Sequence, residues 1–264
     1  MTDRRYLIVT DIEGVAGIDS FEHTRTTDEE QKGPAMDQLG REVEAAVDGI
    51  RAVRPDAAIE VWDGHGTGGL READVTDATY LGEGEPYFDI EGYDAMLFVG
   101  QHAMAGTVGA PLRHTYSSRD VAYYRLNGAF VGEFGARALV AGRQGVPTVY
   151  LSGDDKAARE AELFVPEIET TVVKHGEGRQ AARHLDQAEA CERIRADVPR
   201  AVERAGEIEP FDALEPPYTL EIRFNDPISD EDVERRWGDD DVDVTRVDSR
   251  TVRLASDAID DLPL

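Results

Sequence analysis

The sequence has 264 residues, 41% of them hydrophobic, which is enough to bury the core of one large domain or of one domain with a small appendage. Its formal net charge of −27 disfavours contact with nucleic acid and with anionic membranes. The single cysteine, Cys191, excludes an intrachain disulfide and fits a reducing compartment. No signal peptide and no apolar run of the ~20 residues that span a bilayer is visible. We therefore expect a cytoplasmic protein.

The acidic residues far outnumber the lysines. There are 55 Asp and Glu residues against three lysines, which are Lys32, Lys156 and Lys174. This composition is typical of halophilic adaptation, because a Debye length of about 3 Å at 1 M salt screens the repulsion between like charges. We expect the protein to lose structure in dilute buffer.

Strand and helix patterns alternate along the first two hundred residues. Residues 6–10 form a short apolar run, which predicts a strand covered on both faces. Apolar residues at helical spacing predict a helix over residues 35–54, which Pro55 ends. Further strands are predicted at 58–62, 95–99, 146–151 and 170–174, and further helices at 132–143, 154–164 and 178–205. The alternation predicts an α/β fold, a mostly parallel sheet with helices on both faces.

The pattern changes after Pro210. Residues 218–225 and 241–254 alternate between apolar and polar side chains, which predicts strands. We therefore predict an α/β metal-binding catalytic domain over residues 1–205 and a small β-rich C-terminal region over residues 206–264.

Acids and histidines follow three of the predicted strands. Asp11 and Glu13 follow the first strand, His65 follows the second and His102 follows the third. The carboxyl ends of parallel strands share one edge of a sheet, where ligands bind. Residues two apart in an extended segment point to the same side, so Asp11 and Glu13 can reach one site together. We expect these four side chains to converge.

The chemistry of these side chains indicates a metal centre. Carboxylates and imidazoles without a thiolate suit zinc, manganese or cobalt. Two carboxylates, two imidazoles and one further acid would suffice for two ions that share a bridging carboxylate. Two such ions can activate a water and polarise a carbonyl, which is what cutting an amide bond near neutral pH requires.

Each residue alone also has an ordinary structural interpretation. Asp11 could cap a helix or a turn, His65 could be a turn histidine, and His102 could be a core histidine. His114 lies in a polar stretch and could be a surface loop residue. Glu133 lies near a helix start, where an acid is favourable in any case. The coincidence of three strand ends is what supports the metal centre.

Other functions remain open on the residues alone. Gly64–Gly69 matches the dinucleotide-binding pattern G-x-G-x-x-G, although residues 70–80 lack a helical stripe and His65 occupies the turn. Ser117 and Ser118 lie near His114, but no nucleophile elbow surrounds them. The ligands also allow another two-metal hydrolase, including one for phosphoesters, although no basic cluster lies near the motifs. A metal-storing or scaffold protein of the same fold is the non-enzyme alternative.

Several short segments, ordinary one by one, are specific in combination. They are Asp11-Ile-Glu-Gly-Val-Ala-Gly17, Asp63-Gly-His65, Gly100-Gln-His-Ala103, His114-Thr-Tyr-Ser117, Asn127-Gly128, Val131-Gly-Glu-Phe-Gly135 and Leu151-Ser-Gly-Asp-Asp155. Together they resemble the zinc-dependent D-aminopeptidase family of dipeptide-operon enzymes. Residues 220–226 and 246–253 resemble the carboxyl region of that family, so the resemblance covers nearly the whole chain.

The resemblance implies a role for each candidate residue. Asp11 matches the bridging zinc ligand, and the other zinc ligands match Glu13, His65, His102 and Glu133. His114 matches the catalytic histidine, which polarises the substrate or stabilises the developing oxyanion. The resemblance further implies two divalent ions, with zinc expected, a short peptide substrate with a D-residue at its amino end, and a ring-like homo-oligomer with an enclosed chamber. We therefore expect a metallo-aminopeptidase.

Overall fold

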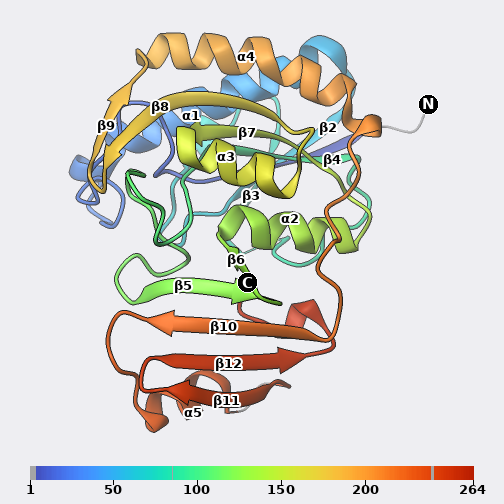
Figure 1. Ribbon diagram of the computed structural model, residues 1–264. Coiled ribbons are helices and arrows are strands. Elements are labelled where there is room, and N and C mark those ends of the chain that lie inside the picture. Colours follow the sequence, from blue (N-terminus) through green and yellow to red (C-terminus); the bar gives the residue numbers. More distant parts are fainter. Residues whose placement is uncertain (1–3, 85, 239–240) are drawn as a thin grey trace.

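A seven-stranded sheet, sheet A, lies at the centre of the computed structural model, which describes residues 4–84, 86–238 and 241–264 (Figure 1). Its strand order is β3-β2-β1-β4-β7-β8-β9. The strands are β1 (Arg5–Thr10), β2 (Ala58–Asp63), β3 (Thr79–Gly82), β4 (Ala95–Gln101), β7 (Thr148–Asp154), β8 (Glu169–Gly178) and β9 (Ala181–His184). All neighbouring pairs are parallel except β8 and β9. Every residue of β4 and β7 is buried, as expected for strands with helices on both sides.

Helices cover both faces of sheet A. Figure 1 shows α1 (Glu29–Val53) and α4 (Gln187–Glu203) on one face and α2 (Glu133–Arg143) and α3 (Asp155–Phe164) on the other. This arrangement confirms the predicted α/β fold. Helix α1 begins at Glu29, earlier than predicted, because the Asp28 side chain accepts a hydrogen bond from the Glu30 amide and caps the helix there. Among the described helices, none is both long and apolar enough to cross a membrane.

The predicted helix over residues 178–205 is wrong in its first part. Residues 169–184 form the antiparallel pair of β8 and β9, and the helix begins only after Asp186, whose side chain accepts hydrogen bonds from the Ala188 and Glu189 amides. The side chains of β9 are alternately exposed and partly buried. This short, alanine-containing edge strand therefore lacks the apolar alternation that would have separated it from the helix.

A second sheet, sheet B, packs below α2 in Figure 1. Its order is β11-β12-β10-β5-β6, and all its neighbouring pairs are antiparallel. The strands are β5 (Val121–Leu126), β6 (Ala129–Val131), β10 (Tyr218–Phe224), β11 (Asp243–Asp248) and β12 (Thr251–Ser256). Helix α5 (Asp230–Trp237) lies between β10 and β11 in the sequence. The C-terminal strands thus pair with a hairpin from residues 121–131, which the sequence did not predict. The division at residue 205 stays a prediction.

Candidate metal centre

The candidate site lies where sheet A reverses its strand order. Strands β1 and β4 are neighbours at the centre of the sheet, and the chain continues from β1 towards β2 but from β4 towards β7. In an open α/β sheet, this reversal leaves a crevice at the carboxyl ends of the strands. Asp11 directly follows β1 and His102 directly follows β4. Their side chains meet, with Asp11 Oδ2 lying 3.1 Å from His102 Nε2.

The two strand ends are packed backbone against backbone. The Asp11 amide donates to the Val99 carbonyl at 2.9 Å, and the Gly14 amide donates to the Gly100 carbonyl at 2.7 Å. A Cβ atom at Gly100 would lie 2.0 Å from the Asp11 carbonyl oxygen, and one at Gly14 would lie 2.2 Å from the Gln101 carbonyl oxygen. Only glycine allows this approach, which places the acids after β1 beside the histidine after β4.

One group of possible metal ligands consists of Asp11, Glu13 and His65, whose ligand atoms lie within 4.8 Å of one another. His65 Nδ1 is 3.2 Å from Asp11 Oδ1 and 3.1 Å from Glu13 Oε2. His65 Nε2 lies 3.0 Å from the Thr24 carbonyl oxygen, which can only accept, so Nε2 carries the proton of the neutral ring. The lone pair of Nδ1 then faces the carboxylates, as in a ligating histidine whose other nitrogen is held by a carbonyl.

The second group consists of His102, His114 and Glu133, also within 4.8 Å of one another. Glu133 Oε1 is 3.6 Å from His102 Nε2 and 3.8 Å from His114 Nε2. The two imidazole rings are stacked, with 4.0 Å between centroids and 13° between planes. The Nδ1 atoms of His102 and His114 each lie 2.9 Å from a backbone carbonyl oxygen, those of Ala103 and Leu112. Both Nε2 lone pairs of the neutral rings are therefore directed into the site.

The electrostatics of the two groups indicate a site for cations. Burial and the charge of Glu13 raise the pKa of Asp11 to about 7. Burial lowers the pKa of His65, but Glu13 and Asp11 outweigh it and raise that pKa well above its ordinary value. Three buried atoms that face the site, Asp11 Oδ2, Glu13 Oε2 and His102 Nε2, have no hydrogen-bond partner among the residues that the structure describes. Oxygen and nitrogen donors left in this state fit zinc or a similar divalent ion.

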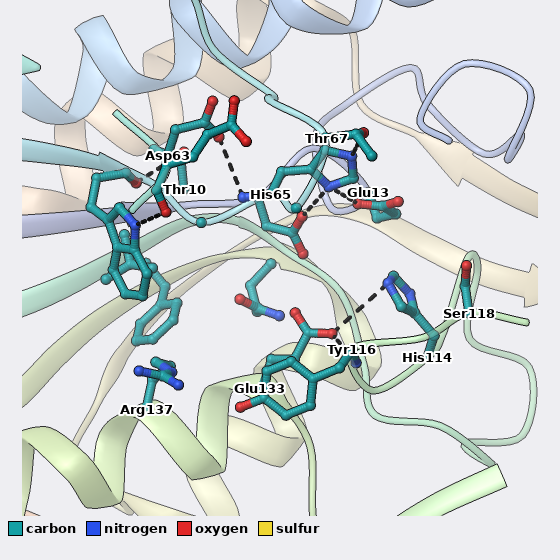
Figure 2. A pocket seen from close by; sticks show the side chains of 18 of the residues that line it. Thr10, Glu13, Asp63, His65, Thr67, His114, Tyr116, Ser118, Glu133 and Arg137 are labelled. Atoms are coloured by element: carbon teal, nitrogen blue, oxygen red, sulfur yellow. Dashed lines mark hydrogen bonds and ion pairs between the residues drawn. The ribbon is translucent and has the colours of Figure 1, made fainter. Parts of the chain in front are cut away.

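Five of these candidate residues, Asp11, Glu13, His65, His114 and Glu133, line a cavity of about 600 Å³. Figure 2 shows Glu13 and His65 on one side and His114 and Glu133 on another, with Tyr116 and Arg137 beyond Glu133. Aromatic side chains form much of the remaining wall, and they are Trp62, Tyr87, Phe98 and Tyr116. The cavity can therefore hold a small organic molecule against the candidate metal centre.

All six residues singled out from the sequence lie around this one site: Asp11, Glu13, His65, His102, His114 and Glu133. Sequence reasoning missed the arginines. Arg25, Arg119 and Arg137 line the cavity, so the expectation that no basic cluster lies near the motifs is wrong. They come from three separate segments, and only Arg137 carried a signal, because it follows Glu133 by four residues on a predicted helix and so shares its face.

The glycine-rich loop after β2 binds a carboxylate of the protein itself. Asp63 Oδ2 accepts hydrogen bonds from the Gly69 amide at 2.8 Å and the Leu70 amide at 3.0 Å. A dinucleotide-binding loop would instead offer such amides to phosphate and lead into a helix. Here the only helical residues that follow before β3 are the single 3-10 turn Glu72–Asp74. The structure therefore does not support the dinucleotide interpretation.

The serine hydrolase interpretation also lacks its geometry. Ser117 Oγ donates to Asp120 Oδ2 at 2.9 Å, so its proton is directed at a carboxylate and not at an imidazole. His114 Nδ1 is hydrogen-bonded to the Leu112 carbonyl oxygen, and His114 Nε2 lies 3.8 Å from Glu133 Oε1. Neither nitrogen is placed to take a proton from Ser117.

The fold and the donor groups define an α/β protein with a candidate metal-binding site at the strand ends. A family model described as D-aminopeptidase matches residues 5–262, and the chain belongs to this family. A D-aminopeptidase of Bacillus subtilis (strain 168) is 33% identical over 147 residues, which are 54% of this chain and 53% of that protein. The chain thus matches about half the length of this curated relative.

The fold is similar to that of a solved structure from Bacillus subtilis, described as the Zn-dependent D-aminopeptidase DppA, a self-compartmentalizing protease. The TM-score is 0.80, and the match covers 97% of this chain and 92% of that one at 23% sequence identity. The likeness extends over both sheets, since it spans nearly the whole chain.

Proposed function

We propose that this protein is a metal-dependent aminopeptidase that hydrolyses short peptides with a D-residue at the amino end. The observation that supports it most is the linkage of two donor groups through Asp11, whose two carboxylate oxygens lie 3.2 Å from His65 and 3.1 Å from His102. Membership of the D-aminopeptidase family supports the reaction, and the names of the similar proteins support zinc and the D-residue.

We propose that the candidate ligands hold two divalent ions. Asp11 would be shared between them, Glu13 and His65 would complete one site, and His102 and Glu133 would complete the other. When bound, such ions supply a water that is acidic enough to attack near neutral pH and positive charge for the carbonyl oxygen. The hydrogen bonds from His65 to Thr24 and from His102 to Ala103 hold the two rings with a lone pair towards the ions.

His114 would move the proton. Burial lowers the pKa of His114 to about 4, so its ring is neutral near pH 7. Because Nδ1 donates to the Leu112 carbonyl, Nε2 has a free lone pair beside Glu133. This atom can accept a proton from the attacking water and pass it to the leaving amine nitrogen.

We also propose a cytoplasmic, ring-like homo-oligomer. The support is the description of the structurally similar protein as self-compartmentalizing. Light scattering coupled to size-exclusion chromatography, followed by electron microscopy of the main species, tests this. A monomer at all protein concentrations in high salt would contradict it.

The test of the function combines metal content with stereochemistry. Elemental analysis of the protein purified in high salt should find about two zinc ions per chain, and D-Ala-Gly should be hydrolysed faster than L-Ala-Gly. A chelator should remove the zinc and abolish peptide hydrolysis, and added zinc should restore both. Phosphoesters are the second substrate class to assay, because three arginines line the cavity. Turnover of p-nitrophenyl phosphate without peptide hydrolysis would replace the aminopeptidase proposal.

A further inference from the structure

Arg137 is a buried cation at the aromatic end of the cavity, and only 4% of its surface is exposed. It lies one helical turn after Glu133 on α2, so both side chains project from the same face of the helix. Figure 2 shows them on the same side of the cavity. An arginine this deeply buried requires an explanation, because removing a charge from water is costly unless the charge is paired.

The contacts of Arg137 within the described part of the chain orient its guanidinium, and none of them is an ion pair. Nη1 donates to the Tyr87 carbonyl at 2.6 Å, and the guanidinium carbon lies 4.0 Å from the centre of the Tyr87 ring. Neither group carries a formal charge. Nη2 is buried and has no hydrogen-bond partner among the described residues. One edge of the guanidinium therefore still has donors to offer.

A second unsatisfied polar atom lies on the same side of the cavity. Tyr116 Oη is buried beside Arg137 and has no other hydrogen-bond partner in the described part of the chain. In Figure 2 the Tyr116 ring extends from the side of Glu133 towards Arg137. The Tyr116 backbone has φ of 59°, a conformation that is rare for a tyrosine, and its amide donates to Glu133 Oε1 at 2.7 Å. Strain of this kind is concentrated at functional sites.

We propose that Arg137, assisted by the Tyr116 hydroxyl, binds a carboxylate of the peptide substrate. This inference rests on the proposed aminopeptidase function and adds a specificity-determining residue to it. A guanidinium edge matches a carboxylate in size and plane, and a phenol can donate to one of the same oxygens. The carboxylate is the free carboxyl terminus of the peptide or an acidic side chain, and the experiment separates the two.

The spacing sets the length of peptide that fits. One turn of α2 separates Arg137 from the candidate ligand Glu133, which is about 6 Å along the helix. An extended peptide advances at most about 3.6 Å per residue, so a carboxylate at Arg137 lies one to two residues from a carbonyl at the metal centre. A dipeptide or tripeptide with a free carboxyl terminus meets this condition.

The experiment compares peptides that differ only in the carboxyl terminus. For the wild-type protein loaded with zinc, kcat/KM for D-Ala-Gly should exceed that for D-Ala-glycinamide by at least about 10-fold, as for a hydrogen bond to a charged group. In Arg137→Gln this preference should vanish through a KM for the acid that is about 10- to 100-fold higher, with kcat little changed. Tyr116→Phe should lower the preference by a smaller factor. Arg143→Gln, an exposed arginine at the end of the same helix, is the matched control and should keep the wild-type ratio.

Two further sets of compounds separate the two carboxylate sources and separate binding from turnover. D-Glu-glycinamide carries its only carboxylate on the side chain, so an Arg137-dependent preference for it would assign that source instead. Analogues of D-Ala-Gly and D-Ala-glycinamide with CH2–NH in place of the amide cannot be hydrolysed, and calorimetry measures their binding without turnover.

The ratio of kcat/KM for the acid to kcat/KM for the amide, measured within one variant, does not depend on the amount of folded protein. Arg137→Lys keeps the charge and serves as a second variant in case Arg137→Gln fails to fold. Equal use of acid and amide by the wild type, or an acid preference unchanged in both Arg137 variants, would overturn the inference while peptide hydrolysis stands. Arg137-dependent binding of the acid analogue without any hydrolysis would support the inference and overturn the aminopeptidase proposal. If the analogues do not bind and no peptide is cleaved, both are overturned.

Discussion

Asp11 and His102 meet across the central pair of strands, with Asp11 Oδ2 3.1 Å from His102 Nε2, although 91 positions separate them in the sequence (102 − 11). Both atoms are buried, and in the described part of the chain neither has a further hydrogen-bond partner. The other oxygen of Asp11 lies 3.2 Å from His65. One carboxylate therefore connects the ends of three strands, which makes it the most informative residue to change.

Replacing Asp11 by Ala should remove metal and activity together. Without this carboxylate, each proposed ion loses a ligand and the two sites lose their shared group. Metal content per chain by elemental analysis and hydrolysis of D-Ala-Gly are the measurements. Asp56→Asn changes an exposed acid in the turn before β2 and should leave both unchanged. A variant at Asp11 that retains two ions and full activity would show that the ligand set is wrong.

Replacing His114 by Ala should keep the metal and lower kcat by about 10²- to 10³-fold. The His114 Nε2 atom lies near Glu133 and is proposed to transfer a proton, so its loss slows the reaction without removing a ligand. Metal analysis separates this role from ligation, since His114 also belongs to the second donor group. If one ion per chain disappears, His114 is a ligand. If metal and kcat are both unchanged, it has neither role.

Replacing Asp63 by Ala should destabilise the protein. Its carboxylate accepts the Gly69 and Leu70 amides, and leaving these buried donors unsatisfied should cost about 2–5 kcal/mol. Urea unfolding with and without zinc measures the loss. Stability equal to that of the wild type would show that the loop finds other acceptors.

Glu42 should make stability depend on pH. Its side chain is fully buried in α1, where burial raises the pKa to about 7 from an ordinary value of 4.5. Because the folded state favours the protonated form, the contribution is favourable below about pH 4.5 and is lost as pH rises through 7. Glu42→Gln, which cannot ionise, should therefore gain stability relative to the wild type on going from pH 5 to pH 8, by roughly 3 kcal/mol at most.

The exposed Glu44 on the same helix is the control for Glu42. Glu44→Gln should follow the wild-type curve of unfolding free energy against pH. Parallel curves for the wild type and Glu42→Gln between pH 5 and pH 8 would show that Glu42 is already ionised at the lower pH.

Salt should stabilise the protein strongly. A net charge of −27 destabilises a compact chain by self-repulsion, and salt at molar concentration shortens the Debye length to about 3 Å. We expect Tm to rise steadily between 0.1 M and 3 M KCl, with loss of structure at the low end. Full folding and activity in dilute buffer, without added divalent ion, would contradict the predicted halophilic adaptation.

The sequence predicted the parts of the fold that depend on local pattern. Buried strands such as β1 and β4 are continuous apolar runs, and acids and histidines directly after them lie at one sheet edge by topology alone. The convergence of His65 with Asp11 and Glu13 follows from that rule. His114 and Glu133 were assigned through the family resemblance, because no rule of spacing brings a loop and a helix start to a strand end.

Other features depend on contacts between distant segments. Strand β10 pairs with β5, and Leu220 lies opposite Leu126, a partnership that neither segment encodes locally. The helix prediction fails at the edge strand β9 because half of its side chains are exposed and it lacks a periodic apolar face. Arg137 was missed because a single arginine in a helix usually faces solvent, and only the tertiary structure shows that this one does not.

The glycines beneath the metal centre also determine where this protein can tolerate sequence change. A Cβ atom at Gly153 would lie 1.9 Å from the Gln101 carbonyl oxygen, as close as the contacts at Gly14 and Gly100. Three neighbouring strand ends thus have no room for even an alanine. Laboratory evolution towards new substrates should therefore yield no viable variants at these three positions, and diversity should accumulate in the aromatic wall around Trp62 and Tyr87.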